Sequence, residues 1–308
     1  MAAIETAGLV HRYGRVQALR GLDLTVPDGS LYALLGRNGA GKTTLLKVLT
    51  GQLIPTAGVT RVLGRDTRRL ATADRQRVGY VAEGMHPHGW MTVQQLEGYL
   101  APLYPSWDAQ LAGELRERFE LVGGRRIRTL SRGEQMKVAL LCALAPVPAV
   151  LLMDEPFTGM DVLTKDEIVG GLLESANRAG TTILICSHDI AELEPLADRV
   201  GFLERGKLVV SEPIESLYGR FFRVEAPASS TASGGLPDNW LRVERAGQQL
   251  RFILERRDAG DDPVGEVRRA FPAASEVTAR PASLREIFVA LVGGSHPETE
   301  REALHEVA

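Results

Sequence analysis

The stretch GRNGAGKTT, residues 36–44, follows the apolar run LYALL and precedes a helix-like pattern. It fits the spacing G-x-x-x-x-G-K-[S/T], in which backbone N–H groups surround phosphate oxygens. Glycines permit the backbone conformations that turn these groups inward, and the positive end of the following helix adds to the attraction. We therefore predict a nucleotide-binding loop that comprises Gly36, Asn38, Gly39, Ala40, Gly41, Lys42, Thr43 and Thr44.

A pair of acidic residues, Asp154 and Glu155 of DEP, follows the apolar run AVLLM. Within the phosphate loop, Lys42 is expected to contact the β- and γ-phosphates, and the Thr43 hydroxyl is expected to bind Mg²⁺. Asp154 would hold the same Mg²⁺, directly or through water. Glu155, one residue on, is the candidate general base that polarises the attacking water. Two surface acids at a strand end would explain DEP alone, but its combination with the phosphate loop favours the functional interpretation.

Composition and charge limit the class of protein. The chain has 308 residues with 44% hydrophobic and 24% charged residues, which is ordinary for a globular protein of about two domains. Its net charge of −3 provides no basic footprint for nucleic acid, so we expect no nucleic-acid partner. Cys142 and Cys186 lie in apolar runs, which favours buried thiols and a cytosolic location.

The pattern of elements predicts an α/β fold. Residues 1 to about 35 read as short antiparallel strands with a Pro-Asp-Gly turn, residues 92 to about 145 read as helical, and strands then alternate with helices. This predicts a mostly parallel sheet with an antiparallel β subdomain and a helical subdomain. Composition shifts near residue 225. We predict a core domain over residues 1–220, a small α/β accessory domain over residues 221–293 and a polar tail over residues 294–308.

Four motifs occur in one chain in a fixed order: GRNGAGKTT, LSRGEQ, LLMDEP and SHD. In this combination the sequence resembles an ABC-type ATPase, the nucleotide-binding subunit of an ABC transporter, over roughly residues 1–220. The resemblance implies an ATP-binding and ATP-hydrolysing enzyme that uses Mg²⁺. It also implies that ATP drives the association of two such subunits, which power transport through a membrane partner.

The resemblance assigns roles to three further residues. It implies that Tyr13 stacks on the adenine ring, although an aromatic at a strand end also explains a residue of this type. It implies that Asp161 lies at the interface between two subunits. It implies that His188 contacts the γ-phosphate and orients the catalytic water, whereas a lone histidine near a strand end is more often structural.

The segment LSRGEQMK begins at Leu130 and opens an apolar helix. The resemblance implies that Ser131 and Gly133 face the γ-phosphate bound to a second subunit, aided by the positive end of the helix. Ser131 and Glu134 also have the spacing of a capping box, and the two roles are compatible. The family pattern has Gly and Gln where this chain has Arg132 and Glu134. A carboxylate near phosphate is unfavourable, and Arg132 is expected to offset it.

A second departure occurs in GYVAEGM, where Glu83 stands at the position of a common family glutamine that helps to bind Mg²⁺. Glu83 retains oxygen ligands and is therefore also expected to bind Mg²⁺. The stretch that follows is the expected docking region for the membrane subunit. Its large apolar residues, which either line a docking groove or form the core of the helical subdomain, are Trp90, Met91, Tyr104 and Trp107.

Two classes of function compete within this resemblance. The favoured class is a transporter ATPase, on the cytoplasmic face of the membrane, with a separate integral membrane subunit and with either a second copy or a paralogue as its ATPase partner. The alternative is a soluble, non-transport ABC ATPase that acts on a macromolecule. The segment between Lys42 and Ser131 has no heptads and no cysteine cluster, and the chain has one phosphate loop, which favours the transporter. Resemblance to drug and lipid exporters points to export.

Overall fold

The computed structural model describes residues 1–85, 88–227, 237–257, 262–270 and 276–293. The chain forms two compact units, Met1–Ser211 and Glu212–Ala308. The predicted polar tail, residues 294–308, and residues 228–236 beside the shift in composition lie outside the described residues. The predicted domain boundary at residue 220 stays a proposal.

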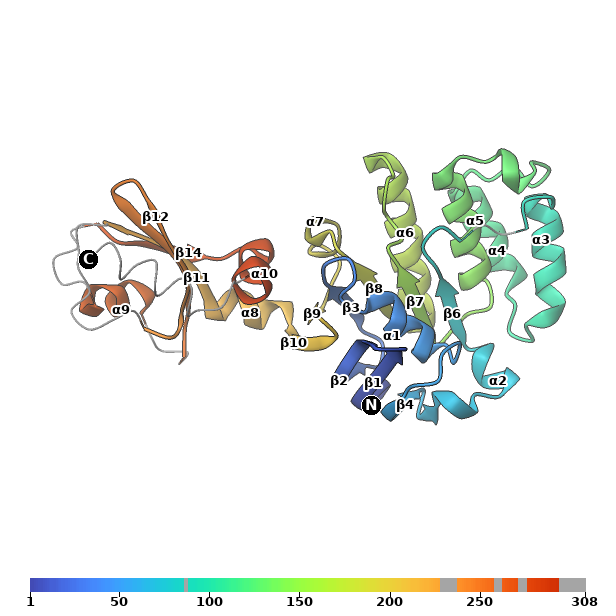
Figure 1. Cartoon of the computed structure of the whole chain (residues 1–308). Helices are drawn as coiled ribbons and strands as arrows, with labels where there is room; N and C mark the ends of the chain where they lie inside the picture. The colour runs from blue at the N-terminus through green and yellow to red at the C-terminus, as the bar shows by residue number, and fades with distance from the viewer. Residues whose placement is uncertain (86–87, 228–236, 258–261, 271–275, 294–308) are drawn as a thin grey trace. The chain divides into compact units, whose positions relative to one another are not determined.

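A six-stranded sheet forms the centre of the first unit, and its strands follow the order β10-β9-β3-β8-β7-β6 (Figure 1). Strand β3 pairs in parallel with β8 and β9, and β7 pairs in parallel with β8 and β6. The mostly parallel sheet predicted from the sequence is therefore confirmed. Its strands are β3 (Leu31–Leu35), β6 (Val78–Val81), β7 (Val150–Asp154), β8 (Thr182–Ser187), β9 (Arg199–Glu204) and β10 (Lys207–Pro213).

A second, antiparallel sheet in this unit has the order β2-β1-β4-β5. Its strands are β1 (Ala2–Tyr13), β2 (Val16–Pro27), β4 (Ala57–Val62) and β5 (Arg65–Asp66). The prediction that the Pro-Asp-Gly turn joins an antiparallel pair is wrong. The turn carries the chain from β2 into β3, which belongs to the central sheet. All five residues of β3 are buried, as expected for a central strand of a parallel sheet.

Helices complete the first unit, and those between β6 and β7 form the predicted helical part. Hydroxyl and carboxylate caps start several of them: Thr92 and Ser131 form capping boxes, and Asp108 and Asp161 accept backbone N–H bonds. The helices are α1 (Lys42–Leu49), η1 (Thr67–Arg69), α2 (Thr72–Arg75), α3 (Val93–Leu100), η2 (Ala101–Leu103), α4 (Ala109–Arg118), η3 (Ile127–Thr129), α5 (Arg132–Leu144), α6 (Val162–Ala179) and α7 (Ile190–Leu193).

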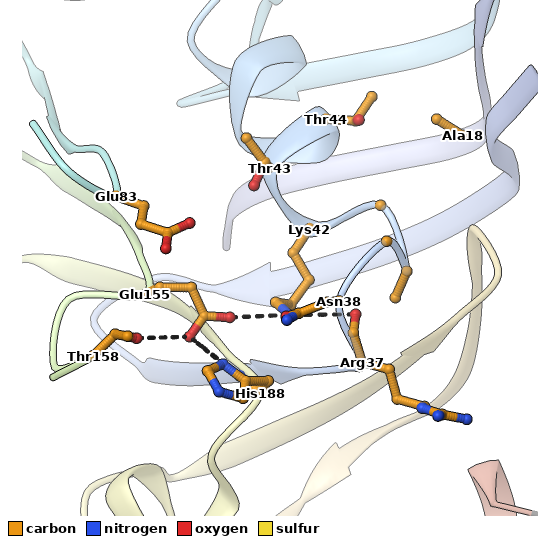
Figure 2. Close-up of a pocket in the computed structure, with 13 residues that line it drawn as sticks. Ala18, Arg37, Asn38, Lys42, Thr43, Thr44, Glu83, Glu155, Thr158 and His188 are labelled. Carbon is orange, nitrogen blue, oxygen red and sulfur yellow. Dashed lines mark hydrogen bonds and ion pairs between the residues drawn. The ribbon is translucent and has the colours of Figure 1, made fainter.

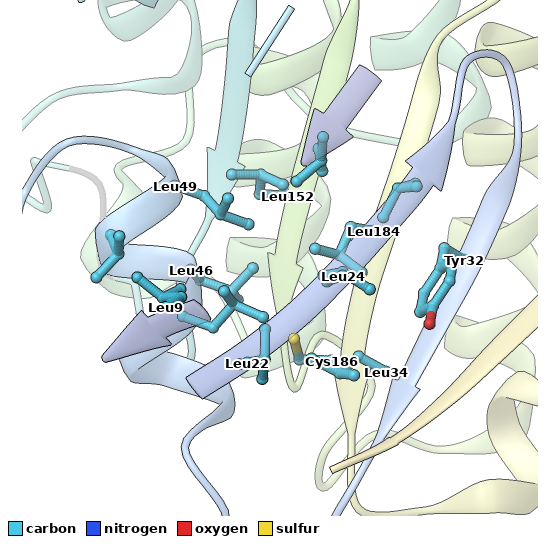
Figure 3. Packing of buried hydrophobic residues seen from close by; sticks show 14 of the residues in the cluster. Leu9, Leu22, Leu24, Tyr32, Leu34, Leu46, Leu49, Leu152, Leu184 and Cys186 are labelled. Atoms are coloured by element: carbon cyan, nitrogen blue, oxygen red, sulfur yellow. The ribbon is translucent and has the colours of Figure 1, made fainter. Parts of the chain in front are cut away.

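The core of the first unit lies between the two sheets and α1 (Figure 3). Leu22 of β2, Leu46 of α1 and Leu184 of β8 belong to one buried cluster, which fixes α1 against both sheets. Cys186 is buried in the same cluster, while Cys142 is only partly buried, and both thiols are free. Apolar burial is the dominant favourable contribution to folding, and here it holds α1, which follows the phosphate loop, against both sheets.

The second unit is the predicted small α/β fold. Its antiparallel sheet has the order β12-β13-β11-β14, and Trp240 stacks on Phe252 in its core, with ring centroids 4.2 Å apart. Its elements are α8 (Ile214–Arg220), β11 (Phe221–Pro227), β12 (Trp240–Ala246), β13 (Gln249–Glu255), α9 (Pro263–Ala270), β14 (Thr278–Pro281) and α10 (Leu284–Val292). Within the described ranges of both units, every helix is too short or too polar to cross a membrane.

Candidate functional site

The phosphate loop connects β3 to α1, and two of its glycines are required by their surroundings. Gly41, the N-cap of α1, has φ of 113°, a conformation that L side chains rarely adopt. A Cβ atom at Gly36 would lie 2.6 Å from the carbonyl oxygen of Leu203 in β9. The loop therefore packs against the sheet at a distance that only glycine allows, with the N-terminus of α1 behind it.

A pocket of about 490 Å³ opens over this loop (Figure 2). It joins the phosphate loop to the chain segments that follow β6, β7 and β8, at the carboxyl ends of the parallel strands where α/β proteins bind ligands. The residues that line it are Ala18, Arg37, Asn38, Gly39, Ala40, Gly41, Lys42, Thr43, Thr44, Glu83, Glu155, Thr158 and His188.

Lys42 is almost fully buried at the base of the pocket. Its Nζ donates a hydrogen bond to the carbonyl oxygen of Gly36 at 2.6 Å. The same Nζ lies 3.0 Å from Oε1 of Glu155, and both side chains are less than one-tenth exposed. The lysine is thus fixed by the loop on one side and by the candidate base on the other, so its charge is directed into the pocket (Figure 2).

Glu155 follows β7 with φ of 48°, in the left-handed region that is unfavourable for a residue with a side chain. Its Oε2 accepts hydrogen bonds from Ser187 Oγ at 3.2 Å and from the His188 backbone N–H at 3.3 Å. Nδ1 of His188 lies 2.8 Å from the same oxygen. Burial opposes ionisation of Glu155, but Lys42 and His188 outweigh it and lower its pKa.

The protonation of His188 follows from this geometry. An ionised carboxylate can only accept hydrogen bonds, so Nδ1 of His188 must carry the proton that it shares with Glu155. The carboxylate thereby fixes the ring and its tautomer. The pair can orient a water molecule and hold a proton near a phosphate, which is the chemistry expected of a base and its partner.

Asp154 is only 1% exposed and occupies the last position of β7. Burial raises its pKa, and the charges of Glu155 and Glu83 raise it further, whereas a hydrogen bond with Thr43 lowers it. Its Oδ1 atom has no hydrogen-bond partner among the described residues. An unpaired carboxylate oxygen beside a hydroxyl and a second carboxylate fits a hard divalent cation such as Mg²⁺.

The residues of LSRGEQ lie at the start of α5. Ser131 and Glu134 form the predicted capping box, because Ser131 N–H donates to Glu134 Oε2 at 2.7 Å and Glu134 N–H donates to Ser131 Oγ at 3.2 Å. Arg125 forms the ion pair with Glu134, whereas the guanidinium of Arg132 lies beside Gly159. That Arg132 offsets the carboxylate near phosphate stays a prediction.

Gly133 has a packing role in addition to the predicted one. A Cβ atom at this position would lie 2.8 Å from Cγ2 of Thr164 in α6. Asp161 caps α6 by accepting the Thr164 N–H at 2.9 Å and the Thr164 hydroxyl at 2.8 Å. Gly133 therefore lets α5 pack closely against α6, and Asp161 stabilises the start of α6 within one subunit.

The pocket brings together the phosphate loop, Glu83, Glu155 and His188, but not every predicted residue. Tyr13 lies at the end of β1, 48% exposed, with its ring packed edge-on against His11. In the part of the chain that the structure describes, the predicted residues absent from the pocket lining are Tyr13, Gly36, Ser131, Gly133, Glu134, Asp154 and Asp161.

Three pocket residues were absent from the sequence prediction. Arg37 lies inside the phosphate loop, so the motif itself could have identified it. Thr158 Oγ1 lies 3.5 Å from Oε2 of Glu155, three residues along the same turn. Ala18 comes from β2, distant in sequence, and only the packing of β2 beside the loop reveals it.

The sequence left open whether the aromatic and methionine residues after Glu83 line a docking groove or form the core of the helical subdomain. The structure shows that they differ in burial. Trp90 is 66% exposed, whereas Met91 is buried in the helical part. Tyr104 lines a shallow pocket of about 130 Å³ together with Tyr80 and Met85. The region therefore contributes both to the core and to an open apolar surface.

Fold and site together define a P-loop ATPase with an ATP-binding cassette architecture. Residues 19–158 match the sequence model of the ABC transporter family. The daunorubicin resistance ATP-binding protein DrrA3 of Streptomyces coeruleorubidus is 33% identical over 306 residues, covering 94% of this chain and 96% of that protein. The chain belongs to the family of ABC transporter ATP-binding proteins and is an ATPase of that family.

Other relatives and a solved structure agree with this assignment. The ABC transporter ATP-binding protein YtrB of Bacillus subtilis is 26% identical over 279 residues, covering 90% of this chain and 94% of that protein. The sulfate/thiosulfate import ATP-binding protein CysA 2 of Chromobacterium violaceum is 35% identical, covering 78% of this chain and 65% of that protein. The dimeric structure of the bacterial ABC transporter cassette MJ0796 superposes with a TM-score of 0.62 at 24% identity, covering 68% of this chain and 98% of that chain.

Proposed function

We propose that this chain powers export through a separate integral membrane subunit, from the cytoplasmic face of the membrane, by ATP-driven association of two ATPase subunits. The observation that carries the proposal is the division of the site. Lys42, Glu155 and His188 line one pocket, while Ser131 and Gly133 lie at the start of α5 and do not line it in the described structure.

A second subunit would complete the site. The Ser131 hydroxyl and the N–H groups at the start of α5 are donors suited to a γ-phosphate, and Ser131 is exposed. Asp161 and Gly133 stand close to the same surface through their contacts with Thr164. The partner is either a second copy of this chain or a paralogue, and each pocket would receive its missing donors from the other subunit.

The residues in and around the pocket have different proposed roles, according to their chemical type. Lys42 and the loop N–H groups would bind the β- and γ-phosphates, with the glycines and Asn38 shaping the loop. Thr43, Asp154 and Glu83 would hold Mg²⁺, which supplies charge neutralisation of the phosphates when bound. Glu155, oriented by Ser187 and fixed to His188, would accept the proton of the attacking water.

The proposals of export and of a role for the second unit are based on alignments with relatives. The alignment with DrrA3, a resistance protein by name, covers 94% of this chain, whereas the alignment with the sulfate importer covers 78%. The second unit therefore has a counterpart in the resistance protein. We propose a core over residues 1–220 and an accessory domain over residues 221–293 that contacts the dimer or regulates it.

The test is a mild-detergent pull-down of tagged Glu155→Gln protein from its native membranes, with and without ATP. We expect a polytopic membrane protein in the eluate and, with ATP, a second ATPase chain or a second copy. A Glu174→Gln variant, altered at an exposed ion pair of α6, is the control for charge removal. Recovery of soluble partners alone would contradict the transporter assignment.

A further inference from the structure

Both carboxylate oxygens of Glu134 are engaged at the start of α5. Oε2 accepts the Ser131 backbone N–H at 2.7 Å, and Oε1 forms an ion pair with the guanidinium of Arg125. The Glu134 carboxylate is thus held next to Ser131, the residue that the proposed function places against phosphate. A glutamate here introduces a negative charge at a surface that must approach an anion.

Arg125 is fixed in position by the backbone around it. Its Nη2 donates to the carbonyl oxygen of Thr129 at 3.1 Å, so the guanidinium bridges η3 and α5. Its backbone N–H donates to the carbonyl oxygen of Val122 at 3.0 Å, and its own carbonyl accepts the Val93 N–H at 3.2 Å. The arginine therefore extends from a turn that is anchored to the start of α3.

The cap alone does not require this arginine. A capping box needs only an acceptor at its third position, and glutamine serves as well as glutamate. What the carboxylate adds is a full charge, and like charges repel at the short distances of a phosphate site. Burial opposes ionisation of Glu134, but the bonds from Ser131 and the charge of Arg125 outweigh it and lower its pKa, so the charge is present at neutral pH.

We propose that Arg125 is a positioning residue that neutralises Glu134 and thereby lets the LSRGE segment approach the phosphates bound to a partner subunit. This inference rests on the proposed function, because it needs a second subunit whose nucleotide meets Ser131. It assigns Arg125, nine positions before Glu134, to the composite site without any contact of its own with the nucleotide.

The experiment measures ATP-driven dimerisation of the full chain by light scattering in a Glu155→Gln background. We expect Arg125→Ala to weaken dimerisation by up to about 25-fold, because two such interfaces form in each dimer and an exposed charge pair contributes up to a factor of about five. Adding Glu134→Gln to Arg125→Ala should restore dimerisation, since the charge that needed neutralising is gone. Arg125→Lys, which keeps the positive charge, should dimerise almost as tightly as the parent.

Two controls separate this role from a structural one. Binding of a fluorescent ATP analogue to the monomer should be equal in all variants, because the pocket does not contain Arg125. Arg126→Ala removes the same charge from a neighbouring side chain that forms no ion pair with the described residues, and it should weaken dimerisation less. If Glu134→Gln fails to rescue Arg125→Ala, the neutralising role is wrong. If the Glu155→Gln parent itself stays monomeric with ATP, the composite site fails and this inference fails with it.

Discussion

Lys42 and Glu155 form an ion pair in the pocket, with Nζ 3.0 Å from Oε1. The pair joins the phosphate loop to the end of β7, two segments separated by more than a hundred residues. It places the lysine that is proposed to bind phosphate directly beside the carboxylate that is proposed to activate water.

Glu155→Gln is expected to lower the melting temperature at pH 7 by about 5–10 °C, because it removes the partner of a buried lysine. The native pKa of Glu155 is lowered from its ordinary value of 4.5, so its charge stabilises the fold above that pH. This contribution disappears as the pH falls through the native pKa. The difference between wild type and variant should therefore shrink below pH 4.5 in thermal scans, whereas a constant difference would contradict the ion pair.

Asp154→Asn should raise the thermal stability of the protein in the absence of ATP while abolishing Mg²⁺-dependent turnover. Burial raises the pKa of Asp154, so its charge at neutral pH costs stability, and an amide removes that cost. We expect a rise of about 2–4 °C in melting temperature at pH 7. A fall in melting temperature would show that the carboxylate stabilises the fold and is not held ready for a cation.

Glu83→Gln should change the Mg²⁺ requirement more than the affinity for ATP. Glu83 lines the pocket and raises the pKa of Asp154 through its charge, which places the two carboxylates near each other. Removing one anionic ligand should raise the Mg²⁺ concentration for half-maximal turnover several-fold, with nucleotide binding in EDTA unchanged. An identical Mg²⁺ titration in wild type and variant would exclude Glu83 from the cation site.

Tyr13→Ala should weaken ATP binding by about 5- to 100-fold, the range for loss of a base-stacking aromatic. Tyr13 is 48% exposed, and its ring makes a T-shaped contact with His11, which leaves a face for an adenine ring. Tyr13→Phe should bind ATP almost as tightly as wild type, because stacking needs the ring alone. Equal affinity for all three proteins in calorimetric titrations would assign Tyr13 to the end of β1 and to no nucleotide contact.

The sequence predicted those parts of the site that are local in the chain. GRNGAGKTT and DEP are continuous motifs, and the pairing of β3, β7 and β8 brings Lys42 and Glu155 to one edge of the sheet, as alternating strands and helices indicate. The capping box of Ser131 and Glu134 was predicted from its spacing alone.

Contacts that depend on tertiary packing were not predictable in the same way. The Pro-Asp-Gly turn reads as a hairpin, yet β3 leaves β2 because an entirely apolar strand gains more by burial on both faces. Arg125 reaches Glu134 only because η3 folds the chain back between them. No periodicity in the sequence specifies a contact of that kind, and the neighbouring Arg132 was the more obvious partner.

In the proposed mechanism, ATP joins two subunits through Ser131 of one and the phosphate loop of the other. The most direct test is the mass of full-length Glu155→Gln protein, measured by light scattering without nucleotide and with ATP and Mg²⁺, beside the same protein carrying Ser131→Arg. We expect a monomer that becomes a dimer with ATP, and a Ser131→Arg variant that binds ATP but stays monomeric. A parent that remains monomeric with ATP, or a Ser131→Arg variant that dimerises as readily, would contradict it.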